Sequence, residues 1–140
     1  MLLALESLSI NPDYLAFFNW PSGGPSNGPR YLLDSNIDWG QDTRKLKAWL
    51  DARNIHQVCR VYFGNAILAH YGIGELPLPG NEDTAERANL DCMAAASVTP
   101  LYGLYVPNDR YRWLREKTPV AKIGYSIYMY DLRKNRLEQR

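Results

Sequence analysis

Strand-like and helix-like segments alternate along most of this chain, and the alternation restricts the fold more than any other feature. Apolar and β-branched runs are followed by Gly, Pro or polar breaks and then by apolar residues at helical spacing. Strands and helices in this order predict a mostly parallel sheet with helices on its faces. We expect an α/β fold of about four strands, at residues 30–34, 57–63, 92–99 and 120–132, and helices at residues 38–53, 65–71 and 108–117.

The first 29 residues have a different character, because a short helical pattern is followed by a Gly- and Pro-rich run. Residues 11–13, Asn-Pro-Asp, are typical of a helix start. Tyr14, Phe17 and Phe18 then share one face at helical spacing. We expect an N-terminal helical arm and loop at residues 1–29, an α/β domain at residues 30–132 and a frayed basic tail at residues 133–140.

Two further segments of the main domain have clear patterns. Residues 74–90 contain Pro77, Pro79 and Gly80 and are expected to form a long surface loop. The last strand shows strict alternation. One set of its side chains is therefore expected to face the core, namely Ala121, Ile123, Tyr125, Ile127 and Met129.

The composition is that of one globular domain, with 140 residues of which 46% are hydrophobic and 22% charged. The net charge of +1 leaves no basic field to attract nucleic acid, so no nucleic-acid partner is expected. No apolar run approaches the ~20 residues of a membrane span, so this fragment is expected to be soluble. Cys59 and Cys92 would form one bridge in an oxidising compartment, but buried free thiols are the simpler expectation.

No motif in the chain indicates a cofactor or a metal. His56 and His70 stand alone, without the paired spacing of zinc ligands. The Gly23-Gly24 pair lacks the lysine of a phosphate loop, and Ser97 lacks the glycines of a nucleophile elbow. We therefore predict no cofactor and no metal.

The densest polar chemistry lies in residues 34–42, Asp-Ser-Asn-Ile-Asp-Trp-Gly-Gln-Asp, between a predicted strand and a predicted helix. Open α/β sheets place ligands at such turns, where the carboxyl ends of parallel strands meet. The ends of the next two strands would bring further amides and hydroxyls to the same edge. The predicted ligand-binding residues are Asp34, Asn36, Asp38, Trp39, Gln41, Asp42, Asn65, Ser97 and Thr99.

Local roles compete with ligand binding at several of these positions. Asp38 with Gln41 fits a helix capping box, and capping is the more probable role for Asp38. Asp42 would complement the helix dipole, and Trp39 would anchor the core beneath the turn. The same oxygens suit sugar hydroxyls or a hard cation such as calcium. Two of the aspartates would also serve a glycoside-cleaving enzyme.

Four segments together have a family resemblance: residues 11–19 (NPDYLAFFN), 30–42 (RYLLDSNIDWGQD), 62–64 (YFG) and 119–127 (PVAKIGYSI). They resemble the carboxy-terminal soluble region of bacterial multi-spanning membrane glycosyltransferases of the protein-O-mannosyltransferase-like class. These enzymes take sugar from a polyprenyl-phosphate carrier. The similarity runs roughly from Glu6 to Leu132, and its most specific part is Asp34 to Asp42. The chain departs from the family pattern at residues 20–22, Trp-Pro-Ser.

The resemblance implies a domain on the extracytoplasmic, periplasmic side of the membrane, with Met1 to Leu8 as the end of the last span. It also implies that the catalytic carboxylate lies in the membrane portion, so the expected function is non-catalytic. Such a domain would bind a carbohydrate or glycan acceptor, or cover the membrane active site, with its own upstream transmembrane domain as partner. A free-standing carbohydrate-active enzyme and a purely structural domain are the alternatives.

Overall fold

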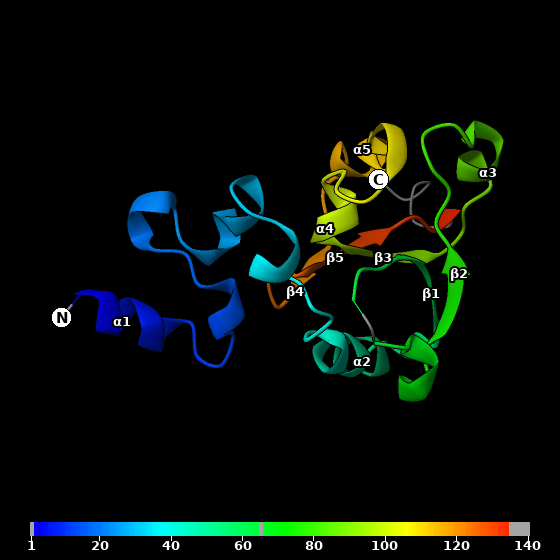
Figure 1. The fold of residues 1–140 in the computed structure, drawn as a ribbon. Coiled ribbons are helices and arrows are strands. Elements are labelled where there is room, and N and C mark those ends of the chain that lie inside the picture. The colour runs from blue at the N-terminus through cyan, green and yellow to red at the C-terminus, as the bar shows by residue number, and fades with distance from the viewer. Residues whose placement is uncertain (1, 65, 135–140) are drawn as a thin grey trace.

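The computed structural model describes residues 2–64 and 66–134, and it has an α/β fold. Its described residues form a mixed sheet of five strands in the order β2-β1-β3-β5-β4 (Figure 1). β1, β2 and β3 run parallel, whereas β5 is antiparallel to both β3 and β4. The α/β class is therefore confirmed, but the sheet is not a mostly parallel one of about four strands. The strands are β1 (Gln57–Val61), β2 (Gly74–Pro77), β3 (Met93–Ser97), β4 (Ala121–Ile123) and β5 (Ile127–Asp131).

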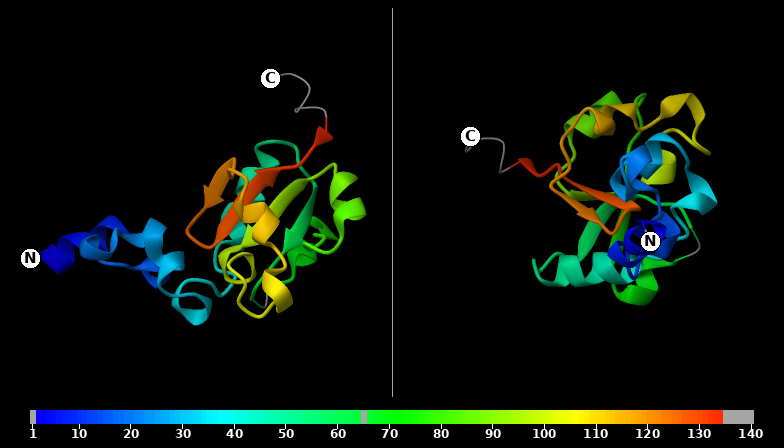
Figure 2. Two further views of the ribbon diagram at one scale, coloured as in Figure 1. Left: turned by 90° about the horizontal axis from the view of Figure 1, so that it is seen from above. Right: turned by 90° about the vertical axis from the view of Figure 1, so that its left-hand side faces the viewer.

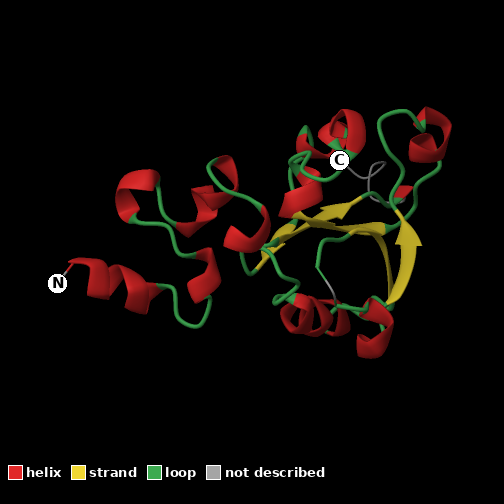
Figure 3. Ribbon diagram, viewed as in Figure 1, coloured by secondary structure: helices red, strands yellow, loops and turns green. Residues whose placement is uncertain are grey.

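Helices cover both faces of the sheet, as Figures 1 and 3 show. On one face, α2 (Thr43–Asp51) and η5, a 3-10 helix at Leu68–Tyr71, pack into one apolar cluster. On the other face, α4 (Val98–Leu101) and α5 (Arg112–Arg115) pack into a second cluster. The result is a helix–sheet–helix arrangement, which leaves the functional surfaces to the sheet edges and to the N-terminal segment.

The central strand β3 is buried along its whole length, with the sequence Met-Ala-Ala-Ala-Ser. Ala94 and Ala96 belong to the cluster under α4 and α5, and Met93 and Ala95 belong to the cluster under α2. Alternate side chains of a strand point to opposite faces, so each face receives small residues here. Small side chains let helices pack close to both faces of the sheet.

The N-terminal segment lies at one end of the molecule (Figures 1 and 2) and is built of short helices. The prediction of a helix starting at residue 11 is wrong, because α1 (Leu2–Ser9) ends before that residue. Only a 3-10 turn follows, in which the Ala16 amide donates to the Asp13 carbonyl. The remaining short helices of this segment are η1 (Tyr14–Ala16), η2 (Trp20–Ser22) and η3 (Pro25–Arg30).

The strand predicted at residues 30–34 is absent. The amides of Tyr31 and Leu32 both donate to the Gly28 carbonyl, so the backbone continues the turn of η3. It then enters η4 (Asp34–Asn36), where Asp34 has a left-handed φ of 62°. Tyr31 and Leu32 are exposed, at 62% and 50%. Their apolar character reflects a surface groove described below, not a buried strand.

The long strand predicted at residues 120–132 is a hairpin of β4 and β5, with Ile123 opposite Ile127. The turn between them needs Gly124, whose φ is 56° and whose missing side chain makes room for the carboxylate of Asp42. Both faces of β5 are buried, because Ile127 and Met129 face one apolar cluster and Tyr128 faces the other. The prediction that Ile123, Ile127 and Met129 face the core is therefore confirmed, and the alternate side chains Tyr128 and Tyr130 are buried against the other cluster as well.

Several predicted elements are shorter or broken. The helix expected at residues 38–53 is confirmed only from Thr43 to Asp51. Within the range 65–71, where a second helix is expected, the structure has the short helix η5, which Gly72 ends in a left-handed conformation. The segment expected as a loop at residues 74–90 contains β2 and α3 (Thr84–Ala88). The helix expected at residues 108–117 is split into η6 (Pro107–Asp109) and α5, because Asn108 and Asp109 have positive φ. Residues 135–140 of the predicted tail lie outside the described residues.

Cys59 and Cys92 form a disulfide, which corrects the expectation of two free thiols. Cys59 lies in β1 and Cys92 directly precedes β3. These two strands pair side by side, so the fold brings the cysteines to a Cα–Cα distance of 6.0 Å. The spacing of the two cysteines in the sequence does not show that their strands are neighbours in the sheet.

No helix in residues 2–64 and 66–134 combines the length and the apolar character needed to cross a bilayer.

Candidate functional site

The acidic turn, residues 34–42, lies where β1 and β3 end, as predicted. Two hydrogen bonds link the three segments: the Asp34 amide donates to the Thr99 hydroxyl at 3.2 Å, and the Phe63 amide donates to the Ser97 hydroxyl at 3.1 Å. Gly64 permits the close approach, because a side chain there would meet the backbone of Trp39 at 2.8 Å. The parallel pairing of β1 and β3 thus brings the predicted residues to one edge of the sheet.

Asp38 is fully buried in this turn. Its Oδ1 accepts a hydrogen bond from the Gly40 amide at 3.1 Å, whereas its Oδ2 is buried without a hydrogen-bond partner among the described residues. Burial raises the pKa of Asp38 to about 6, against the lowering effect of Gly40 and of the Ser97 hydroxyl. Asp38 is not the cap of α2, which begins five residues later, so the capping-box prediction is wrong.

Asp42 is buried as well and connects α2 to the β4–β5 hairpin. Its Oδ2 accepts hydrogen bonds from the amides of Tyr125 and Ser126 and, at 2.8 Å, from the Ser126 hydroxyl. Its Oδ1 lies 3.1 Å from the ammonium group of Lys45. These contacts are all with the protein itself, so Asp42 joins α2 to the hairpin, although it also lines a cavity of about 330 Å³.

Asp34 is partly exposed and is held by an aromatic side chain. The Tyr105 hydroxyl donates to its Oδ2 at 2.7 Å, and the Tyr105 ring stacks on Phe63 with a centroid distance of 5.6 Å. The hydrogen bond to Asp34 raises the pKa of Tyr105. Both Asp34 and Tyr105 have positive φ, at 62° and 61°. Of the three aspartates in the turn, only Asp34 reaches the surface.

The remaining predicted residues divide between surface and core. Trp39 is 58% exposed, which corrects its expected role as a core anchor; its indole N–H donates to the Ser35 carbonyl at 3.0 Å. Gln41 closes the turn on itself, because its Oε1 accepts from the Trp39 amide and its amide nitrogen donates to the Ile37 carbonyl. Asn36 is exposed and donates to the Leu33 carbonyl.

Ser97 and Thr99 are fully buried and brace the turn from beneath, so they do not line a cleft as predicted. Asn65 lies outside the described residues. In the part of the chain that the structure describes, no group of three or more His, Cys, Asp or Glu residues could hold a metal ion. The calcium alternative therefore has no ligand set there.

A groove of about 580 Å³ lies beside the exposed end of the turn, between it and the N-terminal segment. Its floor is aromatic, and Phe18 and Tyr31 stack there with a centroid distance of 6.4 Å. Polar groups at its rim come from amides and hydroxyls. The lining residues are Tyr14, Leu15, Phe17, Phe18, Asn19, Ser22, Tyr31, Leu32, Ser35 and Asn36.

Sequence reasoning found only Asn36 of this groove. The Tyr14, Phe17 and Phe18 pattern was interpreted as the buried face of a helix, and residues 31–32 as part of a strand. The signal that could have found the groove is the large number of aromatic residues on both sides of the Gly/Pro-rich run. Large apolar side chains that flank a loop often remain at the surface and line a binding surface.

Comparison of the chain with protein-family models, with curated proteins and with solved structures finds no match.

Proposed function

We propose that this chain is a non-catalytic accessory domain of a membrane glycosyltransferase, and that it binds the carbohydrate or glycan acceptor in the aromatic groove. The observation that carries the proposal is the lining of that groove. Flat ring faces stand beside the amides of Asn19 and Asn36 and the hydroxyls of Ser22 and Ser35. A sugar ring has apolar C–H faces and hydroxyl edges, which such a mixture of groups complements.

The burial of the aspartates supports the non-catalytic part of the proposal. Glycoside chemistry needs two carboxyl groups that reach the substrate. Asp38 and Asp42 are 0% and 2% exposed, and their described contacts are with the protein itself. The free-standing enzyme would have to work with Asp34 alone, so the structure favours a structural role for the other two.

The proposed location, outside the cytoplasm beside a membrane domain, has two supports. Disulfides form and persist in oxidising compartments such as the periplasm, and Cys59 and Cys92 are bridged. In addition, α1 exposes Leu3, Leu5 and Leu8 at 64%, 55% and 67%. These side chains do not share one helix face, but several exposed apolar residues in one short helix are typical of a surface that packs against a partner. We propose that this partner is the upstream transmembrane domain.

The test of the proposal is a titration of the ¹⁵N-labelled chain with a panel of neutral and acidic oligosaccharides. Amide shifts are expected at residues 14–22 and 31–36, and Tyr31→Ala should abolish them. Ile67→Ala removes an equally exposed apolar side chain elsewhere and should leave them unchanged. Absence of saturable shifts in the groove with every oligosaccharide would refute the proposed carbohydrate site.

A further inference from the structure

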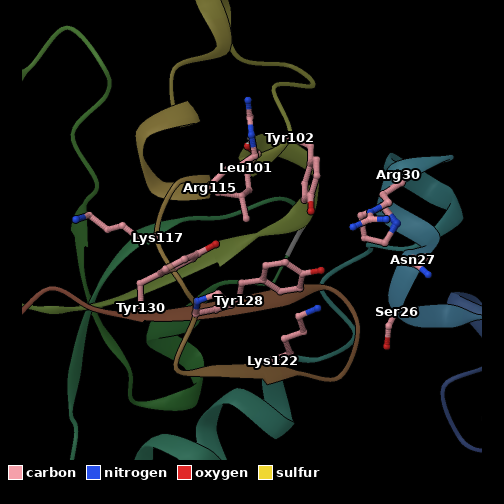
Figure 4. A pocket seen from close by; sticks show the side chains of 12 residues that line it. Ser26, Asn27, Arg30, Leu101, Tyr102, Arg115, Lys117, Lys122, Tyr128 and Tyr130 are labelled. Atoms are coloured by element: carbon pink, nitrogen blue, oxygen red, sulfur yellow. Dashed lines mark hydrogen bonds between the residues drawn. The ribbon is translucent and has the colours of Figure 1, made fainter. Parts of the chain in front are cut away.

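A second cavity, of about 230 Å³, lies between η3 and the β4–β5 hairpin (Figure 4). It is distinct from the aromatic groove and shares no lining residue with it. Four segments contribute to it: η3, the end of α4, the segment around α5, and the hairpin. The lining residues are Ser26, Asn27, Pro29, Arg30, Leu101, Tyr102, Arg115, Lys117, Pro119, Lys122, Tyr128 and Tyr130. We call it the basic tyrosine pocket.

The charge of this pocket is entirely positive, because four of its lining residues are cations and none is Asp or Glu. Arg115 is already engaged by Asp109 and by the Leu101 carbonyl. By contrast, Arg30 and Lys122 have no carboxylate partner among the described residues. Two cations facing a shared cavity without a counter-charge attract an anion.

Figure 4 shows how these groups are directed. The polar ends of Tyr102, Tyr128 and Lys122 come together on the side of the sheet that faces the segment carrying Arg30, whereas Lys117 points away. Lys122 lies opposite Tyr128 in the hairpin, and its ammonium group is 4.7 Å from the centre of that ring. The cation is therefore held over the pocket by a contact that leaves its N–H donors available.

The two hydroxyl groups add donors. Burial raises the pKa of Tyr102 and of Tyr128, so both phenols keep their protons at neutral pH. The positive charge of Arg30 lowers the pKa of both phenols, against the larger raising effect of burial, so this cation acts on the same cavity. The two hydroxyls hydrogen-bond to each other, so an anion in this pocket would meet one remaining O–H donor from one side and cationic N–H donors from the other.

We propose that the basic tyrosine pocket binds a phosphate group, as a phosphate monoester or diphosphate. A phosphate group offers several acceptor oxygens and more than one negative charge, which two cations and the remaining phenol O–H donor match. A carboxylate has one charge and two oxygens and would leave part of this donor set unused. The cavity is smaller than the ~300 Å³ of typical pockets for drug-sized ligands, so it takes the charged group of a larger molecule and not the whole of it.

The experiment is a titration of the chain with inorganic phosphate, glycerol phosphate and acetate, followed by amide shifts and calorimetry. Saturable shifts at Tyr102, Lys122 and Tyr128 are expected with both phosphates. Arg30→Gln and Lys122→Gln should each weaken affinity about 10-fold or more, and Tyr102→Phe less. The matched control is Arg112→Gln, which removes one positive charge from an exposed residue outside the pocket and should leave the affinity unchanged.

Two results would overturn the proposal: no saturable binding of either phosphate at 10 mM (about the weakest affinity worth assigning to a site), or equal losses in Arg112→Gln and Lys122→Gln. Equal binding of acetate would also overturn it. A second arm uses vesicles of phosphatidylcholine with or without phosphatidic acid. Lys122-dependent binding to the phosphatidic acid vesicles assigns the phosphate to a lipid headgroup, and its restriction to soluble monoesters assigns it to a free ligand. The carbohydrate proposal fails or succeeds separately, through Tyr31→Ala.

Discussion

The acidic turn and the basic tyrosine pocket use their polar groups in opposite ways. The turn draws its carboxylates from nine consecutive residues, and two of the three are buried and bonded internally. The pocket draws its cations and hydroxyls from four separate segments, and of its cations only Arg115 has an ion pair among the described residues. The comparison teaches that a dense polar stretch in a sequence can mark a structural junction, whereas available binding groups can be dispersed along the chain.

Replacing Asp42 should show the largest effect. Asp42→Ala would leave the amides of Tyr125 and Ser126 unpaired in a buried site. We expect unfolding free energy to fall by about 3–5 kcal/mol, measured by urea denaturation. Asp51→Ala is the control, because Asp51 is an exposed aspartate paired with Lys47 and should cost less than about 0.5 kcal/mol. Equal losses of unfolding free energy in Asp42→Ala and Asp51→Ala would contradict the structural role that the comparison gives to the acidic turn.

Reduction of the disulfide is expected to have the next largest effect. The bridge closes a loop across 33 residues, so its loss should lower stability by about 3–4 kcal/mol in the loop-entropy account. Urea midpoints with and without reductant measure this, and the Cys59→Ala/Cys92→Ala double variant should no longer respond to reductant. The bridge lies in the sheet and lines neither the groove nor the pocket, so phosphate affinity of the folded protein should not change.

Asp38 gives a pH-dependent prediction. Burial raises its pKa from an ordinary value near 3.8 to about 6, so the folded state holds this proton more tightly than the unfolded state. The stabilising contribution is fully present below pH ~4 and is lost as the pH rises through about 6. Asp38→Asn removes this titration and should gain stability relative to wild type between pH 4 and 7, by up to about 3 kcal/mol.

Unfolding curves at a series of pH values measure that difference. A constant difference between Asp38→Asn and wild type across the range would show that Asp38 does not titrate there. The carboxylate would then have a partner in solution that its Oδ2 lacks in the structure.

Asn36 should show the smallest effect on stability. It is exposed and makes one hydrogen bond to the Leu33 carbonyl, so Asn36→Ala should change unfolding free energy by less than about 0.5 kcal/mol. Glycan binding in the groove should nevertheless weaken, because the amide lies at its rim. A large loss of stability with unchanged binding would place Asn36 with Asp42 as a structural residue.

The parts of the fold that could be predicted are those where local pattern and tertiary structure agree. β1 and β3 are apolar runs bounded by turn residues, and α2 has a clear apolar stripe through Leu46 and Leu50. The strand predicted at residues 30–34 is absent because no strand pairs with it, whereas the strand predicted at residues 120–132 is divided by the turn at Gly124. An apolar or alternating run shows that side chains avoid water or face two environments, but it does not show whether a neighbouring strand is there to pair with it.

The site was predicted in position and misjudged in accessibility. Parallel pairing, which the alternation implied, brings the ends of β1 and β3 together, but the acidic turn joins them from a segment that is not a strand, through the bond from the Asp34 amide to Thr99. Burial of Asp42 depends on the β4–β5 turn more than 80 residues away, which no local pattern reveals. The pocket around Arg30 and Lys122 requires the same long-range knowledge, because its parts meet only after folding.

The bridge between Cys59 and Cys92 also makes the chain between them a covalent ring that contains η5, β2 and α3. A protease that cuts a single peptide bond within this ring releases no fragment, and the nicked molecule gains only the mass of one water until its disulfide is reduced. The two ends of the ring stay beside each other in β1 and at the start of β3. A cut or an insertion between residues 60 and 91 would thus leave β1 and the start of β3 covalently joined through the disulfide.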